Sequence, residues 1–395
     1  MIQLPEDFTR ETRLLMGEER FNSFMRAFDE EPPVSIRINP RKVNHGGCHQ
    51  RVPWCEEGFY LEGRPQFTFD PLFHAGCYYV QEAASMFVCH VLRQFVKGPV
   101  AMLDLCAAPG GKSTAARSVL PEGSVLVSNE PMATRAQILL ENITKWGAQN
   151  SIVTNNYPRD FLKAKAQFDV ILCDVPCSGE GMFRKDPATI GEWSLQNVEK
   201  CLRLQREIVA DAWECLKPGG LLIYSTCTFN IKENEENVRW IIDTYDAEIL
   251  SVPTKHEWHI TGSLLGGFDT PVYRFIPGIT QSEGLFMAVL RKGGSHTGVG
   301  AKNDLKRLKV LKADLPEGDF PQVDLPYSEA LKYLRGEAMV LPADTPRGFV
   351  TVTYKGFPLG PVKNIGNRAN NLYPKPWRIK TSHLPSEEIK IIDIQ

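Results

Sequence analysis

Short apolar runs alternate with amphipathic stretches through the middle of the chain. The runs at residues 100–105, 124–129, 168–174 and 220–226 have the length and composition of buried strands, and stretches of helical periodicity separate them. Strict alternation of strands and helices is typical of a parallel α/β sheet. After these runs, two further apolar stretches within residues 273–292 predict a hairpin that closes one edge of the sheet.

The N-terminal part follows a different pattern. Phenylalanines recur at helical spacing within the first 30 residues, and residues 34–43 alternate like a strand, with Val34, Ile36 and Ile38 on one face. Residues 78–96 predict one amphipathic helix that ends at a Lys-Gly-Pro sequence.

Two glycine-containing stretches punctuate the rest of the chain. The Leu-Lys-Pro-Gly-Gly sequence at 216–220 predicts a helix end before the strand that follows. Residues 293–303 are small and polar, which predicts a linker. Beyond it, residues 348–356 alternate and residues 389–394 resemble a strand, so we expect a small α+β or β-barrel domain there.

These patterns divide the 395 residues into four parts. We predict an N-terminal α/β extension at 1–97, a parallel-sheet domain at 98–292, the linker at 293–303 and a separate domain at 304–395. The hydrophobic content of 43% excludes a disordered chain. No apolar run is long enough to cross a membrane, and the acidic start predicts no signal peptide, so we expect a cytoplasmic protein.

Ten cysteines are present, but no CxxC pair occurs. That spacing argues against a zinc site and against a disulfide framework, so we expect no metal and mostly buried, reduced thiols.

The sequence LDLCAAPGGKST at 103–114 is the strongest chemical signal. It places alanines and glycines where a strand turns into a helix, so a nucleotide-like ligand can approach the backbone and meet unpaired N–H groups. Glu130 ends the next strand, at the position where a carboxylate typically binds ribose hydroxyls. Asp104 precedes the turn and is expected to hold it or to contact the ligand. A tight turn without any ligand is the alternative interpretation.

Two cysteines follow neighbouring strands of the predicted sheet. Asp174 ends one strand and Cys177 lies in the Pro-Cys-Ser-Gly turn after it, while Cys227 follows the strand at 220–226. Ligands of open α/β sheets bind beyond the carboxyl ends of the strands, so we expect these three side chains in one crevice. Paired thiols there suggest covalent catalysis or a redox pair. The acids Glu233, Glu235 and Glu236 are expected to be mostly structural.

Together these motifs resemble the Sun/Nop-type RNA 5-methylcytosine methyltransferases. The motifs QEAAS at 81–85, LDLCAAPGGK, DVPCSGEGM with RKDP, and STCT all occur in the family's order between residues 81 and 292. The whole chain is similar to the bacterial RsmF-type members, which act on small-subunit ribosomal RNA, and residues 347–378 resemble their PUA-like RNA-binding module. The resemblance implies a Rossmann-like sheet that binds S-adenosylmethionine.

The resemblance also implies roles for single residues. Cys227 is the nucleophile that adds to carbon 6 of cytosine, and Cys177 assists its later release. Asp174 holds the base through its exocyclic amine, and Lys112 contacts the base or its neighbours. The implied cofactor contacts come from Cys106, Ala107, Ala108, Pro109, Gly110, Gly111, Lys112, Glu130, Arg135, Asn155 and Asp174. Members often carry an Asp after the third strand, where Asn155 or Asn156 stands here, so we expect an amide at the adenine contact.

The C-terminal domain is also where basic and aromatic residues gather. The window 346–380 contains no Asp or Glu; its cations are Arg347, Lys355, Lys363, Arg368, Lys375, Arg378 and Lys380, and its aromatics are Phe349, Tyr354, Phe357, Tyr373 and Trp377. The net charge of −2 conceals this segregation, since residues 301–395 hold 15 Lys and Arg against 11 Asp and Glu. The window predicts an RNA surface, with a solvated basic face over packed aromatics as the alternative. Arg37, Arg41 and Lys42 are expected to extend it.

We therefore predict a monomeric, S-adenosylmethionine-dependent RNA cytosine-5 methyltransferase that acts on 16S ribosomal RNA or the small ribosomal subunit. A transfer-RNA methyltransferase, a non-catalytic ribosome-assembly factor and a thiol–disulfide enzyme are the alternatives.

Overall fold

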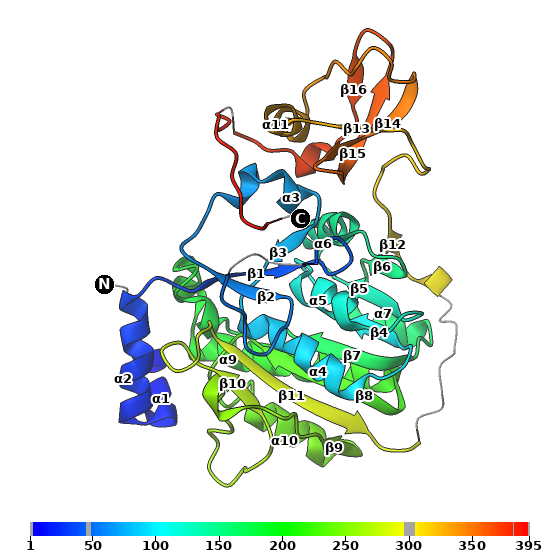
Figure 1. The fold of residues 1–395 in the computed structure, drawn as a ribbon. Coiled ribbons are helices and arrows are strands. Elements are labelled where there is room, and N and C mark those ends of the chain that lie inside the picture. The colour runs from blue at the N-terminus through cyan, green and yellow to red at the C-terminus, as the bar shows by residue number, and fades with distance from the viewer. Residues whose placement is uncertain (1–2, 45–48, 296–304, 382, 394–395) are drawn as a thin grey trace.

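The computed structural model describes residues 3–44, 49–295, 305–381 and 383–393. Figure 1 shows a central sheet with helices on both faces, a smaller N-terminal sheet beside it, and a C-terminal module at one end. Of the helices in the described ranges, none is long and apolar enough to cross a bilayer.

The N-terminal part begins with two helices, as the phenylalanine spacing predicted. Strands β1, β2 and β3 then form an antiparallel sheet in the order β2-β1-β3. The elements are α1 (Glu6–Met16), α2 (Glu18–Arg26), η1 (Ala27–Asp29), β1 (Val34–Ile38), β2 (Gly58–Leu61), η2 (Phe67–Phe69), α3 (Pro71–His74), β3 (Tyr78–Val80), η3 (Ala84–Met86) and α4 (Phe87–Phe95). The helix predicted for residues 78–96 is therefore wrong in its first half, because Tyr78–Val80 pairs with β1 and the α-helix starts only at Phe87.

The central sheet has nine strands in the order β10-β11-β8-β7-β4-β5-β6-β12, with β9 paired to β11. Strands β8, β7, β4, β5 and β6 are parallel, so their carboxyl ends lie along one edge. Their bounds are β4 (Ala101–Asp104), β5 (Val125–Asn129), β6 (Ser151–Thr154), β7 (Phe168–Asp174), β8 (Leu216–Thr226), β9 (Ala247–Ile249), β10 (Tyr273–Phe275), β11 (Leu285–Lys292) and β12 (Val310–Leu311). The predicted α/β fold, and the hairpin of β10 and β11 at its edge, are confirmed.

Helices cover both faces of this sheet because the strands are apolar on both sides. One core contains buried residues of α4 and α5, the other those of α7, α9 and α10. The bounds are α5 (Gly111–Val119), α6 (Ala133–Trp146), α7 (Pro158–Lys163), η4 (Glu180–Met182), α8 (Ala188–Glu192), α9 (Leu195–Cys215), α10 (Glu235–Thr244) and η5 (His256–Trp258). The predicted helix end before this strand is confirmed, but α9 already stops at Cys215, and residues 216–220 belong to β8, with Gly219 in the left-handed region at φ 73°.

The chain returns to the central sheet before it enters the C-terminal module. After η6 (Leu305–Arg307), strand β12 pairs antiparallel with β6, Val310 opposite Thr154, and Leu308 is buried in the central core. The domain boundary predicted at residue 304 is therefore too early. Most of the predicted linker lies outside the described residues.

The C-terminal module is a four-stranded sheet in the order β13-β14-β15-β16 with one helix. Its elements are β13 (Gln322–Asp324), α11 (Tyr327–Arg335), β14 (Gly348–Tyr354), β15 (Phe357–Asn364), β16 (Ala369–Asn371) and η7 (Lys375–Trp377). Its core is continuous with that of the N-terminal sheet. The strand predicted at 389–394 is absent from the described residues 389–393; Ile391 and Ile392 are buried instead.

Candidate active site

A tight turn joins β4 to α5 at the carboxyl edge of the central sheet. Gly110 has φ 114°, a left-handed value that favours glycine, and α5 begins at the next residue. The turn is held by backbone bonds from Leu105 to Leu172 (3.0 Å) and from Ala107 to Asn129 (2.8 Å). The first N–H groups of a helix have no intrahelical partner, so the start of α5 offers donors to a ligand.

Asp104, at the end of β4, stabilises this turn by a hydrogen bond with the first part of α5. Its Oδ2 accepts a hydrogen bond of 2.6 Å from the Ser113 hydroxyl. Its Oδ1 is buried and has no hydrogen-bond partner in the described part of the chain. Burial raises the pKa of Asp104 to about 7, and the bond from Ser113 partly opposes this.

The turn and the strand end of β7 enclose a cavity of about 200 Å³. Among the residues predicted for the site, Cys106, Ala107, Ala108, Pro109, Gly111, Lys112 and Asp174 line it. Asp104 lines it too, as does the stretch from Tyr79 to Glu82.

Glu130 and Arg135 contact each other, and Arg135 also contacts the turn. The Glu130 carboxylate is almost fully buried; Oε1 accepts from the Met132 N–H (2.9 Å) and Oε2 lies 3.5 Å from Arg135 Nη1. Arg135 also donates to the Ala108 carbonyl oxygen (2.9 Å). The two side chains thus connect the end of β5 to the turn, and contact of either with a cofactor stays a prediction.

Asn155 and Asn156 are held by protein partners. Asn155 donates to the carbonyl oxygens of Glu130 (2.9 Å) and Pro131 (3.0 Å), and its own oxygen accepts from the Lys309 ammonium (2.8 Å). Asn156 exchanges hydrogen bonds with the Lys309 backbone. Both amides therefore bind the segment that carries β12, and the adenine contact stays a prediction.

The two predicted active-site cysteines lie together. Cys177 Sγ is 3.2 Å from Cys227 Sγ, and the Cys227 N–H points at Cys177 Sγ at 3.4 Å. The parallel pairing of β7 with β8 places Asp174 opposite Ser225, so both following loops start at the same edge. A second contact, between the hydroxyls of Ser178 and Thr228 (2.8 Å), joins these loops.

A basic and an acidic group lie beside the thiols. The Lys112 ammonium and Asp174 Oδ2 are 2.8 Å apart. Burial lowers the pKa of Lys112, but attraction by Asp174 outweighs this and the net shift is upward. The hydrogen bond from Cys177, aided by Lys112, lowers the pKa of Cys227. The same bond, together with burial, raises that of Cys177. Cys227 is thus the thiol that ionises first.

The sequence did not predict three residues that stabilise the two cysteine-containing loops, namely Glu180, Asn230 and Gln205. Glu180 accepts from the N–H groups of Phe229 (2.8 Å) and Asn230 (3.0 Å), and the Asn230 amide reaches back to Glu180, Ser178 and Glu233. Gln205 donates to Glu233 (2.6 Å), which holds the Ser178 N–H (3.0 Å). Glu233 is therefore structural, as expected. Glu180 lies in the GEG sequence, Asn230 in NIKENE and Gln205 in α9, and these separate stretches do not predict that the three side chains meet.

The basic residues expected to extend the RNA surface near the N-terminus are largely unavailable. Arg37 has no exposed surface; it bonds Gln81 and Thr114 and lies over the Trp146 ring. Lys42 donates to the carbonyl oxygens of Ala75 (2.7 Å) and Lys145 (2.8 Å). The prediction is wrong for both residues; Arg41 alone of the three is exposed.

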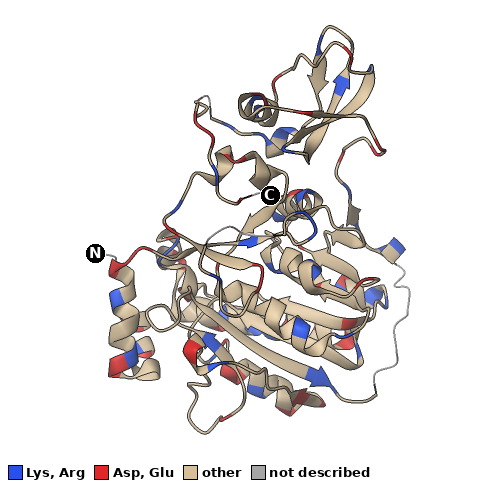
Figure 2. Cartoon of the chain, in the orientation of Figure 1, with Lys and Arg blue, Asp and Glu red and all other residues tan. Residues whose placement is uncertain are grey.

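In the C-terminal window most cations are exposed, whereas most aromatic side chains are buried or half-buried. All its Lys and Arg are exposed apart from the half-buried Arg378, and Figure 2 places basic residues on this module. Tyr354 and Tyr373 are buried in the shared core, with Trp377 packed against it. Only Phe349 is exposed among the aromatics. The rings therefore mostly support the module, and the exposed cations are what it offers to RNA.

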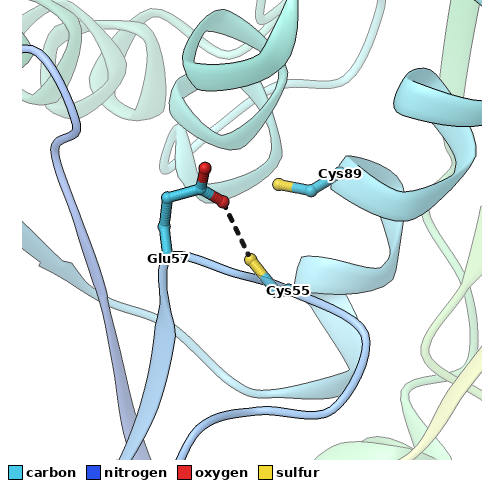
Figure 3. Close-up of side chains that lie close together, drawn as sticks. All are labelled: Cys55, Glu57 and Cys89. Atoms are coloured by element: carbon cyan, nitrogen blue, oxygen red, sulfur yellow. Dashed lines mark hydrogen bonds between the residues drawn. The ribbon is translucent and has the colours of Figure 1, made fainter.

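A second group of thiol and carboxyl side chains comes from the residues just before β2 and from α4 (Figure 3). Sulfur and oxygen atoms of Cys55, Glu57 and Cys89 are within 4.8 Å of one another. The Cys55 thiol donates to Glu57 at 3.6 Å, and the other Glu57 oxygen pairs with Arg93. This cluster has three potential ligands among the described residues, whereas a structural zinc site takes four. That the protein needs no metal stays a prediction.

Three family models match the chain. The model described as 16S rRNA methyltransferase RsmB/F matches residues 96–291, the N-terminal domain of 16S rRNA methyltransferase RsmF matches 4–83, and the methyltransferase RsmF PUA domain matches 320–379.

Curated relatives carry the name ribosomal RNA small subunit methyltransferase F. The protein from Pectobacterium atrosepticum is 34% identical over 74% of this chain and 63% of its own length, and that from Escherichia fergusonii is 33% identical over 74% and 64%. The chain thus spans less than two thirds of these relatives. The Cronobacter sakazakii protein is 30% identical over 94% of this chain and 96% of its own length.

Solved structures share the fold. A methyltransferase homolog protein from Pyrococcus horikoshii is 26% identical, with a TM-score of 0.60 over 73% of this chain and all of its own. NSun6 from the same organism, solved with SFG, is 21% identical, with a TM-score of 0.61 over 74% of this chain and 99% of its own. Taken with the matched models and the relatives, this places the chain in the RsmB/F family of 16S rRNA methyltransferases, with an RsmF-type N-terminal domain and a C-terminal PUA domain.

Proposed function

We propose that this protein methylates carbon 5 of a cytosine in 16S ribosomal RNA and takes the methyl group from S-adenosylmethionine. The observation that carries the proposal is the pair of thiols 3.2 Å apart, Cys177 and Cys227, beside the Lys112–Asp174 ion pair. The family, and the name that the curated relatives share, support the substrate.

The residues around the glycine turn fit this cofactor. The start of α5 offers unpaired N–H groups, and Asp104 Oδ1 is a buried acceptor without a partner in the described ranges. Residues 106–111 and Asp104 would hold the amino acid part and Glu130 the ribose. When bound, S-adenosylmethionine supplies an electrophilic methyl group.

The chain's own residues would activate the base. The Cys227 thiolate adds to carbon 6 of cytosine, and the electron pair of the 5,6 double bond makes carbon 5 nucleophilic. Asp174 accepts a hydrogen bond from the exocyclic amine, which cytosine has and uracil lacks. The hydrogen bond from Cys177 lowers the pKa of Cys227, and Lys112, which is paired with Asp174, assists this.

Release of the product would complete the cycle. After methylation a base removes the proton of carbon 5, the sulfur–carbon 6 bond breaks, and the electron pair restores the 5,6 double bond. The departing sulfur is that of Cys227, and Cys177 lies next to it at 3.2 Å. This proximity supports an exchange of a proton between Cys177 and Cys227 as the bond breaks.

The RNA would present the cytosine outside its stack. A base paired in a duplex cannot reach a thiol at the sheet edge, so the target is a loop, a bulge or an unpaired strand. The exposed cations of the PUA domain would bind phosphates and position that strand.

Bisulfite sequencing of total RNA from a deletion strain and a complemented strain tests the proposal. We expect one or a few 16S cytidines to lose methylation in the deletion strain and to regain it on complementation. Loss confined to transfer RNA would contradict the ribosomal substrate and favour the transfer-RNA alternative. Unchanged methylation, with no binding of adenosylmethionine in calorimetry, would favour an assembly factor.

The role of the PUA domain has its own test. Lys363→Ala with Arg368→Ala removes two exposed cations of this domain, and Lys163→Ala with Lys255→Ala removes two exposed cations elsewhere. We expect only the first pair to weaken RNA binding. The slope of log K against log salt concentration should become shallower by about 0.7 for each phosphate of a single strand that the protein no longer neutralises. Equal effects of both pairs would contradict a specific role for the domain.

A further inference from the structure

The QEAAS motif contains a buried amide whose role the proposed reaction leaves unassigned. Gln81 follows β3 and is only 6% exposed. Its backbone is held by Ser35, which accepts from the Gln81 N–H (3.1 Å) and donates its hydroxyl to the Gln81 carbonyl (2.6 Å). The neighbouring Glu82 caps the following turn through the Ala84 N–H (2.9 Å). Glu82 is therefore structural, whereas Gln81 has a side chain left to explain.

Arg37 determines which way the Gln81 amide points. Arg37 Nε donates to Gln81 Oε1 at 2.8 Å. A guanidinium has no acceptor, so the atom that faces it must be the amide oxygen and the NH₂ group must point the other way. Arg37 itself is fixed by Thr114 (2.6 Å) and Ser118 (2.9 Å) of α5. Arg37 is thus a positioning residue for Gln81.

The NH₂ group of Gln81 is buried without an acceptor. Nε2 has no hydrogen-bond partner among the described residues, and it lies against Gly111, where an added Cβ would be 3.4 Å away. A buried donor without a partner destabilises the fold by the full cost of its desolvation, so natural proteins rarely retain one without a use. The missing acceptor is therefore expected to come from a ligand.

Gln81 lies where two cavities meet. It lines the cavity of about 200 Å³ that contains Lys112 and Asp174, and also a wider one of about 730 Å³. Val80 and Glu82 are the other residues common to both walls.

The wider cavity suits an RNA strand. Its wall contains the cations Arg64, Arg184 and Lys185, the carboxylates Glu31 and Glu82, and the prolines at 32 and 33. Arg184 pairs with Glu283 at 2.8 Å, so Arg64 and Lys185 are the cations that this wall offers to phosphates, and the prolines offer apolar surface to bases. Arg184 Nε is a second buried donor without a partner in the described ranges. The volume of about 730 Å³ is in the range of small-molecule binding sites. Because the cofactor turn lines only the smaller cavity, the ligand that spans the junction is the RNA.

We propose that Gln81 is a substrate-binding residue whose NH₂ group donates to the acceptor edge, N3 and O2, of the target cytosine, while the adjoining nucleotide lies in the wider cavity. This inference rests on the proposed function. Asp174 can only accept, and so can bind the amine of the base but not its carbonyl. The Gln81 amide supplies the complementary donor, and two groups of opposite kind would then recognise the two sides of the base.

Gln81→Glu tests this with almost no change of shape. The carboxylate keeps the bond to Arg37, so the fold is preserved, but an acceptor replaces the donor. We expect kcat/KM for the RNA to fall by at least about tenfold, while the melting temperature and the affinity for adenosylmethionine in calorimetry stay unchanged. Ser118→Ala, which removes a hydrogen bond to Arg37 away from both cavities, is the matched control and should leave kcat/KM within about twofold of wild type.

Each other outcome has a distinct meaning. An unchanged kcat/KM for Gln81→Glu, or a weakened affinity for adenosylmethionine with KM for RNA unchanged, would overturn the assignment to the base. A similar loss of kcat/KM in Ser118→Ala would mean that Gln81 has only a structural role. If the wild-type protein methylates no cytidine in any RNA pool, the proposed function itself fails, which the wild-type reaction shows separately.

Discussion

The molecule contains two pairs of neighbouring cysteines in contrasting surroundings. Cys177 and Cys227 follow parallel strands at the carboxyl edge of the central sheet, are partly exposed, and lie beside the Lys112–Asp174 pair. Cys55 and Cys89 lie in the core that contains α4 and α5 and are 2% and 0% exposed. A carboxylate of Glu57, paired with Arg93, is the charged group next to them.

Proximity of two thiols is therefore not what makes a candidate active site. In each pair a hydrogen bond between the thiols lowers the pKa of one of them, Cys227 or Cys89. The difference is exposure, since the loops at the sheet edge leave Cys177 and Cys227 reachable. In the second pair Cys89 points its thiol at the Ala115 carbonyl oxygen (3.6 Å) and Cys55 points at Glu57, so both sulfurs are satisfied inside the core. Substitution and labelling of the two pairs can test this contrast.

Cys227→Ala should have the largest effect. Without the thiolate no adduct to carbon 6 forms, so methylation should fall by more than about 10⁴-fold, on the scale of removing a covalent nucleophile. Single-turnover assays with labelled adenosylmethionine measure this. Cys55→Ala is the control with the same chemical change in the other pair, and a comparable loss there would break the distinction.

Cys177→Ala should slow turnover by about 10² to 10⁴-fold, because proton exchange with the Cys227 sulfur is lost. The adduct should then accumulate and appear as a retarded band in a denaturing gel. If neither turnover nor the adduct changes, Cys177 has no part in release.

The two pairs should also differ in their alkylation by iodoacetamide. The hydrogen bond from Cys177 and the charge of Lys112 lower the pKa of Cys227, so its reaction should persist below the pH at which ordinary thiols become protonated. Cys55 and Cys89 can react only when the structure around them opens locally, so they should react at least about tenfold more slowly than Cys227. Mass spectrometry after timed labelling separates the sites.

Substitution of Lys112 tests whether its charge contributes to the lowered pKa of Cys227. In Lys112→Met a cation that favours the thiolate is lost and Asp174 is left unpaired, so the pH midpoint of Cys227 labelling should rise. A midpoint that stays in place would mean that Lys112 does not tune the nucleophile.

The sequence alone predicted which side chains lie together at the sheet edge, because local features encode their positions. Strand ends at Asp104, Asp174 and Thr226 follow from short apolar runs, and parallel strands bring their carboxyl ends to one edge. The motifs in between then specified the turn and both cysteines. Nothing in that inference needed contacts between distant residues.

What the sequence could not predict depends on such contacts. Arg37 alternates with Ile36 and Ile38 and so was expected to face solvent, but α5 and the Trp146 ring cover that side of β1. The two residues of β12 have no strand pattern of their own; their conformation comes from pairing with β6. Gln81 carries no local sign of its partner, which lies 44 residues earlier in the chain.

The smallest effect is expected for Cys89→Ala. Because Cys89 packs in the core that contains α4 and α5, removal of its sulfur leaves a small void and should lower the free energy of unfolding by about 1 kcal/mol. Activity below the unfolding transition should stay at the wild-type level, because Cys89 lies in the core and away from the thiols at the sheet edge. Chemical denaturation measures the first quantity and methylation of RNA the second. A loss of activity without loss of stability would mean that this buried pair has a chemical role after all.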